Sequence, residues 1–550
     1  MPGVKNVLLF TLILIFAFIN TSFPGVEIKK WESFDIRLAA KNKYDNPYIA
    51  SFPDDGEPLV KIKVIGTSGD AQGKEYILKG FWDGGDYWRV RFAPPECGDW
   101  RYVTISSDSG MDGKTGEITC TDWTEEQKVE NPTRRGLIYV NNEGARAGRF
   151  FEYADGTPYL WVGDIWSYWT KKGVPFSYFK ELVNDRVKKG FTLGQYRFAF
   201  NGRGYPLDES YDNLNIDEMR RIDGMISYAN SRGMSVWILH WWGGKYVSSI
   251  DVEKVRRWSR YLVARFATYN VVWVAAGEYN LYNYGDVGID YWKKLGDFID
   301  KEDPYQRITG IHHTPPTWSG GEEAPMRSSG ELLHNESWFD YSQIQSGHGR
   351  WKNELIPIVV AADYARKPSK PTVVTEPWIE FVKRSTPAQN VRFGGWSALL
   401  SGAAGHCYGG GGIWMANVPE EARKPFSYDI EWFHETLNYP GGNQIGYMSK
   451  FLSGIQWWNL EPHPELISEY PGKYCSAVPG IEYVVYLRYG GPVKINLEDA
   501  SQGSMFNVKW FNPRIGKYEK TGTVAGGEIV RLHAPDRNDW VMHICKSETE

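Results

Sequence analysis

The sequence predicts an α/β protein, a (β/α)8 TIM barrel flanked by an N-terminal β-sandwich and a small C-terminal β-sandwich. Residues 23–125 alternate apolar and polar side chains with a period of two, as antiparallel strands do. Residues 136–460 alternate short apolar runs with helix-like segments, the pattern of parallel α/β folds. The two-residue period returns in residues 462–550. The chain of 550 residues has room for such an arrangement, since domains usually take about 100–200 residues each.

Residues 1–22 resemble a signal peptide. Lys5 supplies the positive charge, and residues 7–19 form an apolar stretch shorter than the ~20 residues of a membrane span. We expect an exported protein, in the periplasm, at the cell surface or outside the cell, with no membrane contact beyond this signal. An uncleaved anchor is the alternative, because no clean small-x-small cleavage site stands out.

The overall charge gives no support for nucleic-acid or anionic-membrane partners. Lys and Arg number 62 against 67 Asp and Glu, which leaves a net charge of −5 without a basic block. The aromatic content of 25 Trp, 34 Tyr and 25 Phe suits a carbohydrate partner, because rings stack on the apolar faces of sugars. Some of these rings will instead fill the cores. The oligomeric state stays open.

The five cysteines contain no Cys-x-x-Cys pair, so neither a zinc site nor a redox motif is predicted. Cys97 could bridge with Cys120 and Cys475 with Cys545, which would leave Cys407 free. That pattern is compatible with export.

The N-terminal sandwich rests on strand-like runs such as 59–65, 87–92 and 100–105, which are separated by turns rich in Gly and Asp. A charged connector, 123–135, leads into the middle of the chain.

Eight strand candidates, most of them followed by a helix candidate, predict the barrel. The strand candidates are 159–163, 191–198, 235–240, 271–276, 308–312, 341–345, 372–375 and 403–406, and the clearest helix candidates are 176–189, 216–231, 252–269 and 291–301. A doubly wound open sheet is the structural alternative, but no Gly-rich phosphate loop supports it. The C-terminal sandwich is predicted from the runs 483–488, 493–497, 506–511 and 540–544.

Two glutamates follow buried strand candidates of the barrel. Glu278 ends the segment 270–278, and Glu376 ends the segment 371–376. A carboxylate after a buried strand lies at the end where parallel α/β folds place their active sites. Two such carboxylates on separate strands are what retaining glycoside hydrolysis requires, one as acid/base and one as nucleophile.

The other strand ends also carry polar or aromatic side chains able to bind a sugar, which points to one shared top-face pocket. The substrate-binding candidates are Asp164, Trp166, Arg197, His240, Trp241, Tyr279, His313, Gln345, His348, Trp378 and His406. Trp166, Trp241 and Trp378 are the expected stacking platforms. Trp241 and Trp242 cannot both face the pocket, and Asp164 could hold an arginine such as Arg197 instead of substrate.

No cofactor is predicted. His240, His312 and His313 could converge with the two glutamates on a metal ion, but no His-x-His or His-Glu-x-x-His spacing supports this. A serine nucleophile lacks a Gly-x-Ser-x-Gly elbow in the barrel region.

Four segments carry a resemblance to a known family. They are Gly163-Asp-Ile-Trp166, the run ending in Ala-Ala-Gly-Glu278, Lys370-Pro-Thr-Val-Val-Thr-Glu-Pro377, and 402–409 with Ile413-Trp414. The barrel region resembles the clan A-like glycoside hydrolases, and within them the apiosidase-type family. The N-terminal region resembles a domain of uncharacterised function that often precedes such barrels. The segment 508–516 resembles a small β-domain associated with collagen binding.

The resemblance implies a secreted glycoside hydrolase that acts on a poly- or oligosaccharide by a retaining mechanism. It implies that Glu278 is the acid/base and Glu376 the nucleophile. Two departures weaken any transfer of substrate: Gly277 stands where many clan members have an Asn that contacts the sugar 2-hydroxyl, and apiosidase-type relatives carry Asp at the position of Glu278.

Two other functions remain open at the level of sequence. A non-catalytic carbohydrate- or matrix-binding protein would use the sandwiches for binding and the barrel as a scaffold. A polysaccharide lyase would need a uronate substrate and a Tyr or His base.

Overall fold

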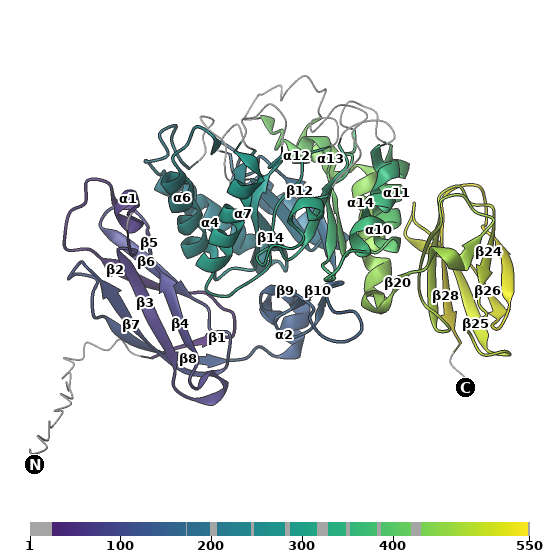
Figure 1. Ribbon diagram of the computed structural model, residues 1–550, viewed down its shortest axis with the longest axis horizontal. Coiled ribbons are helices and arrows are strands. Elements are labelled where there is room, and N and C mark those ends of the chain that lie inside the picture. The colour runs from purple at the N-terminus through teal and green to yellow at the C-terminus, as the bar shows by residue number, and fades with distance from the viewer. Residues whose placement is uncertain are drawn as a thin grey trace, which may run out of the picture.

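The structure is a computed structural model with three parts, a β-sandwich, a barrel and a second β-sandwich (Figure 1). It describes residues 25–54, 56–171, 173–197, 206–243, 247–280, 287–315, 328–347, 352–381, 387–419 and 431–547. The expected signal, 1–22, and the candidate His348 lie outside these residues.

The N-terminal part is a sandwich of two sheets, as predicted, with strand orders β1-β8-β7-β3-β4 and β2-β6-β5. The strands are β1 (Val26–Lys29), β2 (Phe34–Ala39), β3 (Val60–Gly66), β4 (Glu75–Lys79), β5 (Phe81–Trp82), β6 (Tyr87–Phe92), β7 (Gly98–Ser106) and β8 (Thr115–Thr121). Alternate residues of β3 are buried because one face of the strand meets the core. One pair departs from the antiparallel expectation: β1 runs parallel to β8, because β1 continues into β2 of the other sheet and forms no hairpin with β8.

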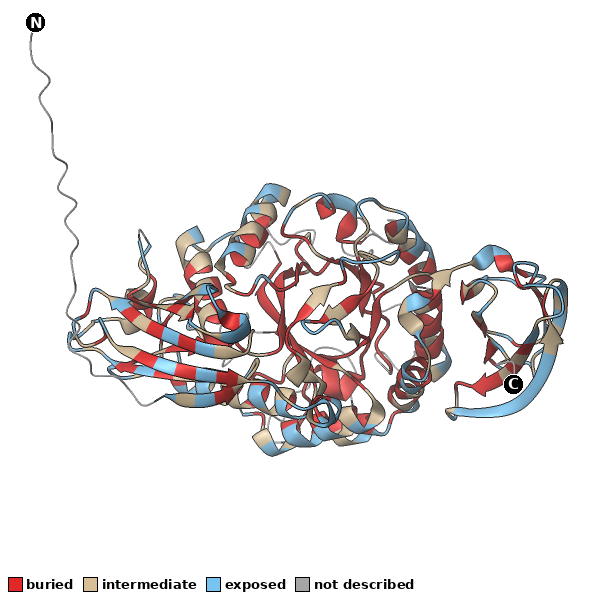
Figure 2. Cartoon of the chain, turned by 90° about the horizontal axis from the view of Figure 1, so that it is seen from below, coloured by how far each residue is buried: buried red, intermediate tan, exposed pale blue. Residues whose placement is uncertain are grey.

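A short connector closes the lower end of the barrel. It contains α2 (Glu125–Glu130) and a three-stranded sheet, β9 (Ile138–Val140), β10 (Phe151–Tyr153) and β11 (Pro158–Tyr159). Side chains of this sheet share one hydrophobic cluster with the barrel interior. The view from below shows buried residues across this end (Figure 2).

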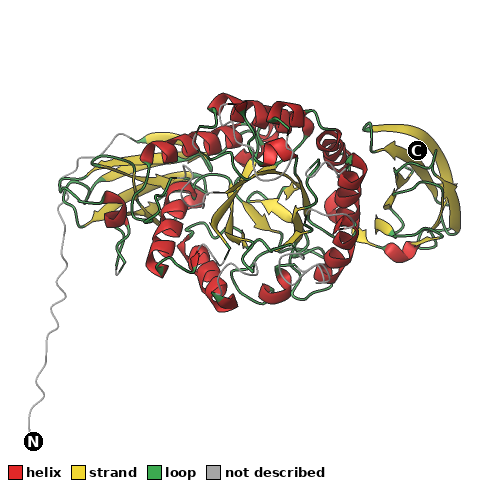
Figure 3. Ribbon diagram, turned by 90° about the horizontal axis from the view of Figure 1, so that it is seen from above, coloured by secondary structure: helices red, strands yellow, loops and turns green. Residues whose placement is uncertain are grey.

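The middle of the chain forms the predicted barrel, with the parallel strand order β16-β15-β14-β13-β12-β19-β18-β17. The strands are β12 (Trp161–Trp166), β13 (Leu193–Arg197), β14 (Ser235–Trp242), β15 (Val271–Gly277), β16 (Thr309–Gly310), β17 (Ser342–Gln345), β18 (Thr372–Glu376) and β19 (Gly405–Tyr408). Each overlaps one predicted strand. From above, helices surround the strands as a ring (Figure 3).

The principal helices of this ring pack apolar faces against the sheet. They include α3 (Phe176–Lys189), α4 (Ile216–Ser231), α6 (Val252–Phe266), α7 (Gly288–Glu302), α10 (Ile356–Tyr364), α11 (Ala388–Leu400) and α14 (Pro440–Ser453). In α4 the side chain of Asn215 caps the N-terminus by accepting from the Glu218 N–H, and Met219, Ile222 and Ile226 are buried. This spacing of three and four residues places the apolar side chains on one face.

The C-terminal part is also a two-sheet arrangement, with strand orders β20-β22-β23-β28-β25-β26 and β21-β24-β27. Its strands are β20 (Glu461–Pro462), β21 (Ile467–Ser468), β22 (Tyr474–Val478), β23 (Glu482–Leu487), β24 (Pro492–Asn496), β25 (Met505–Asn512), β26 (Lys517–Ala525), β27 (Ile529–His533) and β28 (Trp540–Lys546). It contacts the barrel through Arg392 of α11, whose Nε and Nη2 lie 2.6 and 2.7 Å from the two carboxylate oxygens of Asp539.

All five cysteines are free. The possible bridge between Cys475 and Cys545 is wrong, since β23 separates their strands. Cys475 is paired with Val485, whereas Cys545 is paired with Glu482. Two strands and three residues of offset exceed the ~7 Å over which Cα atoms can be bridged.

The barrel has a seam between β16 and β17, which form no strand pair among the described residues. Two hydrogen bonds cross this seam: Asp340 N–H donates to the Thr309 carbonyl at 3.0 Å, and Thr309 N–H donates to Asp340 Oδ2 at 2.7 Å. Burial raises the pKa of the Asp340 carboxyl to about 7. The seam therefore depends on an acid that loses its proton near neutral pH.

We predict that the wild-type protein becomes less stable as pH rises and that Asp340→Asn reduces this decrease. A carboxyl with a raised pKa binds its proton more tightly in the native than in the unfolded chain, where the value is about 3.9. The free energy of unfolding should therefore fall as pH rises from about 4 to about 7 in the wild type. Asparagine keeps the acceptor for Thr309 but cannot ionise. Chemical denaturation across this range should show a smaller decline for the variant.

The exposed Asp217→Asn serves as the matched control, because the Asp217 side chain is 92% exposed. Parallel pH curves for Asp340→Asn and the wild type would contradict this account of the seam.

Candidate active site

Glu278 and Glu376 lie at the same end of the barrel. Glu278 follows the last residue of β15, and Glu376 is the last residue of β18. Glu376 is 8% exposed and Glu278 is partly buried. Glu278 has a φ of 43°, in the left-handed region that non-glycine residues seldom adopt. The chain thus turns sharply at the point where the strand gives way to its loop.

A histidine that follows β16 links two groups of β18. His312 Nε2 lies 3.2 Å from Glu376 Oε2, and its Nδ1 lies 3.0 Å from Thr375 Oγ1. The ring also packs edge-on against Trp237 of the barrel interior, with centroids 6.0 Å apart. With a hydrogen on Nε2, His312 donates to Glu376 and supports its charged form.

The surroundings of Glu278 favour its protonated form. Burial raises the pKa of Glu278, and the negative charge of Glu376 raises it further. The Arg197 guanidinium and His312 act in the opposite direction, as does the Gln345 amide, which donates to Glu278 Oε1 at 3.2 Å. Together these effects raise the pKa of Glu278. One carboxyl able to hold a proton beside a second that accepts hydrogen bonds is an acid/base pair.

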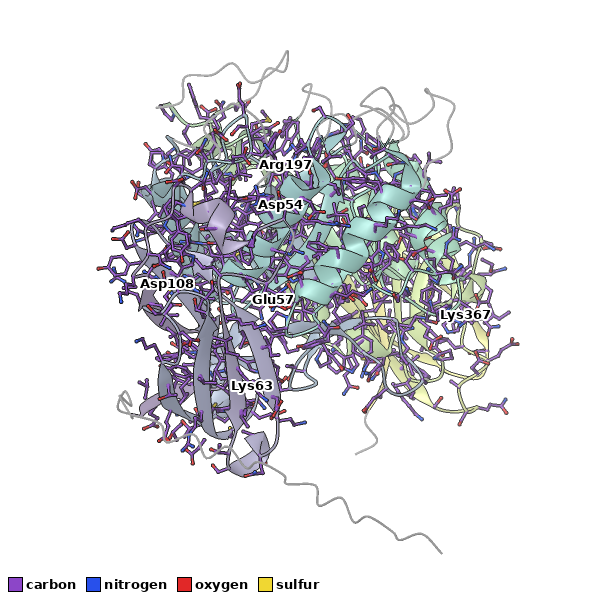
Figure 4. All side chains as sticks on the ribbon, turned by 60° about the vertical axis from the view of Figure 1, so that its left-hand side comes forward. Asp54, Glu57, Lys63, Asp108, Arg197 and Lys367 are labelled. Atoms are coloured by element: carbon purple, nitrogen blue, oxygen red, sulfur yellow. The ribbon has the colours of Figure 1, made fainter. Side chains whose placement is uncertain are left out.

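Arg197 and Trp242 complete this group of side chains. The Arg197 guanidinium carbon lies 3.1 Å from the centroid of the Trp242 ring, a cation–π contact. Figure 4 places Arg197 high in the barrel, toward the ends of the strands that carry the two glutamates. Both side chains are at most 7% exposed.

Trp242 also explains why residue 277 is glycine. The two residues are paired across β14 and β15. A Cβ at position 277 would lie 2.3 Å from two Trp242 ring atoms and 2.7 Å from Leu239 Cδ1. The indole occupies the space that an asparagine at this position would need. The glycine at 277, where many clan members have Asn, therefore goes together with a large ring at Trp242 on the neighbouring strand, which fills the vacated space.

Of the predicted site residues, Glu278, Glu376, Arg197 and Gln345 come together. The substrate-binding candidates predicted from the sequence did not include Trp242 or His312, and His312 was considered only as a possible metal ligand. The histidine pair 312–313 was visible as a strand-end feature, but the sequence does not show which ring points inward. The sequence signal for Trp242 was Gly277, because a glycine leaves room for a large side chain on the neighbouring strand.

Asp164 and Trp166 lie on the helix side of the sheet. Asp164 Oδ2 accepts from Arg186 Nε of α3 at 2.6 Å and from Trp166 Nε1 at 2.8 Å. Trp166 packs edge-on against Phe179 of α3. Asp164 does bind an arginine, but its partner is Arg186 and not Arg197. Neither residue lies beside the two glutamates, so the expected platform at Trp166 is wrong.

His240, Trp241 and His406 also face the helices. His240 is fully buried with its ring 5.2 Å from that of Trp273, and Trp241 Nε1 donates to Ser259 Oγ of α6 at 3.2 Å. His406 lies against Gly394 of α11. Burial lowers the pKa of both histidines to about 3, so they are neutral structural groups. Trp242, and not Trp241, is the ring that faces inward.

Tyr279, His313 and Trp378 lie just beyond the ends of three barrel strands. Tyr279 packs edge-on against Trp292 of α7, and His313 Nε2 lies 2.9 Å from Asn280 Nδ2. The Trp378 N–H donates to Asn353 Oδ1 at 3.2 Å. Their roles in substrate binding remain predictions.

Two further findings concern the described part of the chain alone. It contains no group of three or more His, Cys, Asp or Glu side chains placed to hold a metal ion. Its helices include none that is both long and apolar enough to span a membrane.

We predict that Gly277→Ala destabilises the protein by about 1–3 kcal/mol, because the new methyl group overlaps the Trp242 ring. Gly224→Ala in α4 is the matched control: its Cβ would meet only Phe176 Cζ, at 3.8 Å. That change should stabilise by about 0.5–1 kcal/mol, since alanine favours helix over glycine. Denaturant titration measures both. Equal stability of Gly277→Ala and the wild type would disprove the steric argument.

Three family models match successive parts of the chain. They are the "Domain of unknown function (DUF5060)" at residues 27–107, the "Apiosidase-like, catalytic domain" at residues 145–459, and the "Putative collagen-binding domain of a collagenase" at residues 462–544. No curated protein matches the chain.

Solved glycoside hydrolases share the fold. One described as "Glycoside hydrolase" is 20% identical, covers 76% of this chain and 99% of its own, and has a TM-score of 0.66. A family 5 glycoside hydrolase from Bacteroides vulgatus ATCC 8482 is 20% identical over 76% of this chain and 96% of its own, with a TM-score of 0.65. A "putative glycoside hydrolase" from the same organism is 18% identical over 95% of this chain and 100% of its own, with a TM-score of 0.68.

The structural likeness establishes the barrel, and the catalytic-domain model spans more than half of the 550 residues. The chain therefore belongs to the apiosidase-like family of glycosidases.

Proposed function

We propose that this protein is a secreted glycoside hydrolase that cleaves a poly- or oligosaccharide by a retaining double displacement. Glu376 is the nucleophile and Glu278 the acid/base. The observation that carries the proposal is the opposite environment of the two carboxyls: burial and the Glu376 charge raise the pKa of Glu278, whereas His312 contacts Glu376. Family membership favours this enzyme over a non-catalytic binding protein.

In the first step Glu376 attacks the anomeric carbon while Glu278 donates its proton to the departing oxygen. The bond from sugar to leaving group breaks as a sugar–carboxylate ester forms. Glu376 loses its negative charge as the neutral ester forms. Glu278 gives its proton to the leaving oxygen and takes up the negative charge. His312 keeps Glu376 oriented, through its contacts with Glu376 and Thr375, until the attack.

In the second step Glu278, now ionised, removes a proton from water, and the water oxygen attacks the anomeric carbon. The ester bond breaks and Glu376 regains its charge. The enzyme returns to its starting protonation state with Glu278 protonated. Arg197 and Gln345, which both favour the charged form of Glu278, stabilise it at this stage.

Substrate contacts are assigned by position relative to these two carboxyls. Arg197, whose guanidinium lies over the Trp242 ring, is close enough to Glu278 to favour its charged form and is proposed to contact the sugar. Tyr279, His313 and Trp378 lie farther along the strand ends and are proposed to contact neighbouring sugar units. A panel of plant and algal glycans, assayed for released reducing sugar, identifies the substrate.

Glu278→Gln and Glu376→Gln should each lower kcat/KM by roughly 100- to 10,000-fold, because each removes one of the two reacting groups. Thermal denaturation should show that both variants remain folded. Azide should restore turnover of an aryl glycoside in Glu376→Gly and give a glycosyl azide of inverted anomeric configuration. Full activity in either Gln variant would rule out the scheme.

The alkaline limb of the pH–rate profile should report the proton on Glu278. Gln345→Leu removes an N–H that stabilises the ionised carboxyl, so the pKa of Glu278 should rise and the limb should move to higher pH. The profile of kcat/KM measures this. A limb that moves to lower pH, or stays in place, would contradict the assignment of Glu278 as the acid.

A further inference from the structure

Two cysteines of the N-terminal sandwich lie on neighbouring strands. Cys97 immediately precedes β7, and its neighbour Gly98 is paired directly with Cys120 of β8. Each thiol affects the pKa of the other, which places the two side chains near one another. Both are free in this structure, Cys97 partly buried and Cys120 only 2% exposed.

The backbone holds this pair in a fixed position. The Cys97 carbonyl accepts from the Ala71 N–H at 3.0 Å. Gly98 adopts a φ of 129°, and a Cβ there would lie 2.0 Å from the Ser68 carbonyl oxygen. On the other strand, Cys120 is paired with Ile28 of β1 as well as with Gly98. Neither cysteine can move far from the other without disturbing three strands or the turn at Ser68.

We propose that Cys97 and Cys120 form a structural disulfide when the chain is in an oxidising compartment. Cysteines this close on neighbouring strands can reach a bonded geometry by side-chain rotation, since bridged Cα atoms lie within about 4.4–6.8 Å. The remaining cysteines do not compete: Cys407 lies inside the barrel, and Cys475 and Cys545 are two strands apart.

The chemistry is exchange with an external disulfide, such as oxidised glutathione. The Cys97 thiolate, the more accessible of the two, attacks one glutathione sulfur, and one glutathione leaves as a thiolate. The Cys120 thiolate then attacks the Cys97 sulfur and releases the second glutathione. The two cysteines lose two electrons and two protons in total, and one glutathione disulfide becomes two thiols.

The timing follows from burial, which raises the pKa of both thiols, that of Cys120 to about 12. Few thiolates exist in the folded domain, so the bond forms while the sandwich folds and is afterwards slow to exchange. The bond lies at the open end of the hairpin formed by β7 and β8, where it links the start of β7 to the end of β8. It adds a covalent tie to a sheet edge formed by the short strand β1.

The test uses the full-length protein secreted into an oxidising compartment, unfolded in denaturant and alkylated with iodoacetamide. We expect three alkylated cysteines of five, and a peptide pair in which Cys97 is linked to Cys120. Reduction with dithiothreitol, continued until all five cysteines can be alkylated, should lower the Tm of the wild type by at least a few degrees. Five alkylated cysteines, or a linked pair that involves another cysteine, would overturn the proposal.

Two variants separate the bond from general effects of cysteine removal. Cys97→Ser should give four alkylated cysteines and a Tm that reduction does not change. The matched control Cys545→Ser, also at a partly buried cysteine, should keep the 97–120 linked pair and the response to reduction. A wild-type Tm that is the same before and after reduction would refute the stabilising role. None of these outcomes depends on the proposed glycosidase activity.

Discussion

The charge of Glu376 acting on Glu278 is the interaction on which the site depends. Two carboxyls in a poorly solvated strand-end site cannot both ionise at low cost, so the charge of one keeps a proton on the other. This requires β15 and β18 to present both groups at the same end of a nearly closed barrel. The His312 ring contacts Glu376 through Nε2 and supports the charged form of that carboxyl.

Much of the architecture was predictable because strands and helices leave local periodic patterns. The eight barrel strands and the two sandwiches follow from such patterns, and Glu278 and Glu376 follow from their place after apolar runs. The side of the sheet on which strand-end residues lie was not predictable in this way. Strict alternation from Trp237 and Leu239 places Trp241 inward, yet Trp242 is the inward ring. The space left by Gly277 on the adjacent strand decides the matter, and that neighbour is distant in sequence.

Long-range ion pairs were equally hidden from the sequence. Asp164 meets Arg186 from the following helix, and Arg392 meets Asp539 far along the chain. At the other interface Asp223 of α4 binds both Arg91 of β6 and Arg265 of α6. The Arg392–Asp539 and Arg91–Asp223 pairs join the two sandwiches to the barrel. Charge composition alone cannot reveal them, because each depends on which elements the fold brings together.

The left-handed backbone at Glu278 bears on the choice of acid at this position. Aspartate adopts such a conformation more readily than glutamate, since its short side chain can bond to the local backbone. Glutamate, in turn, reaches one methylene farther toward a substrate. Aspartate at this position would thus favour the turn, and glutamate favours reach. The strained turn makes residue 278 a point at which the depth of the reaction centre can be adjusted without rebuilding the barrel.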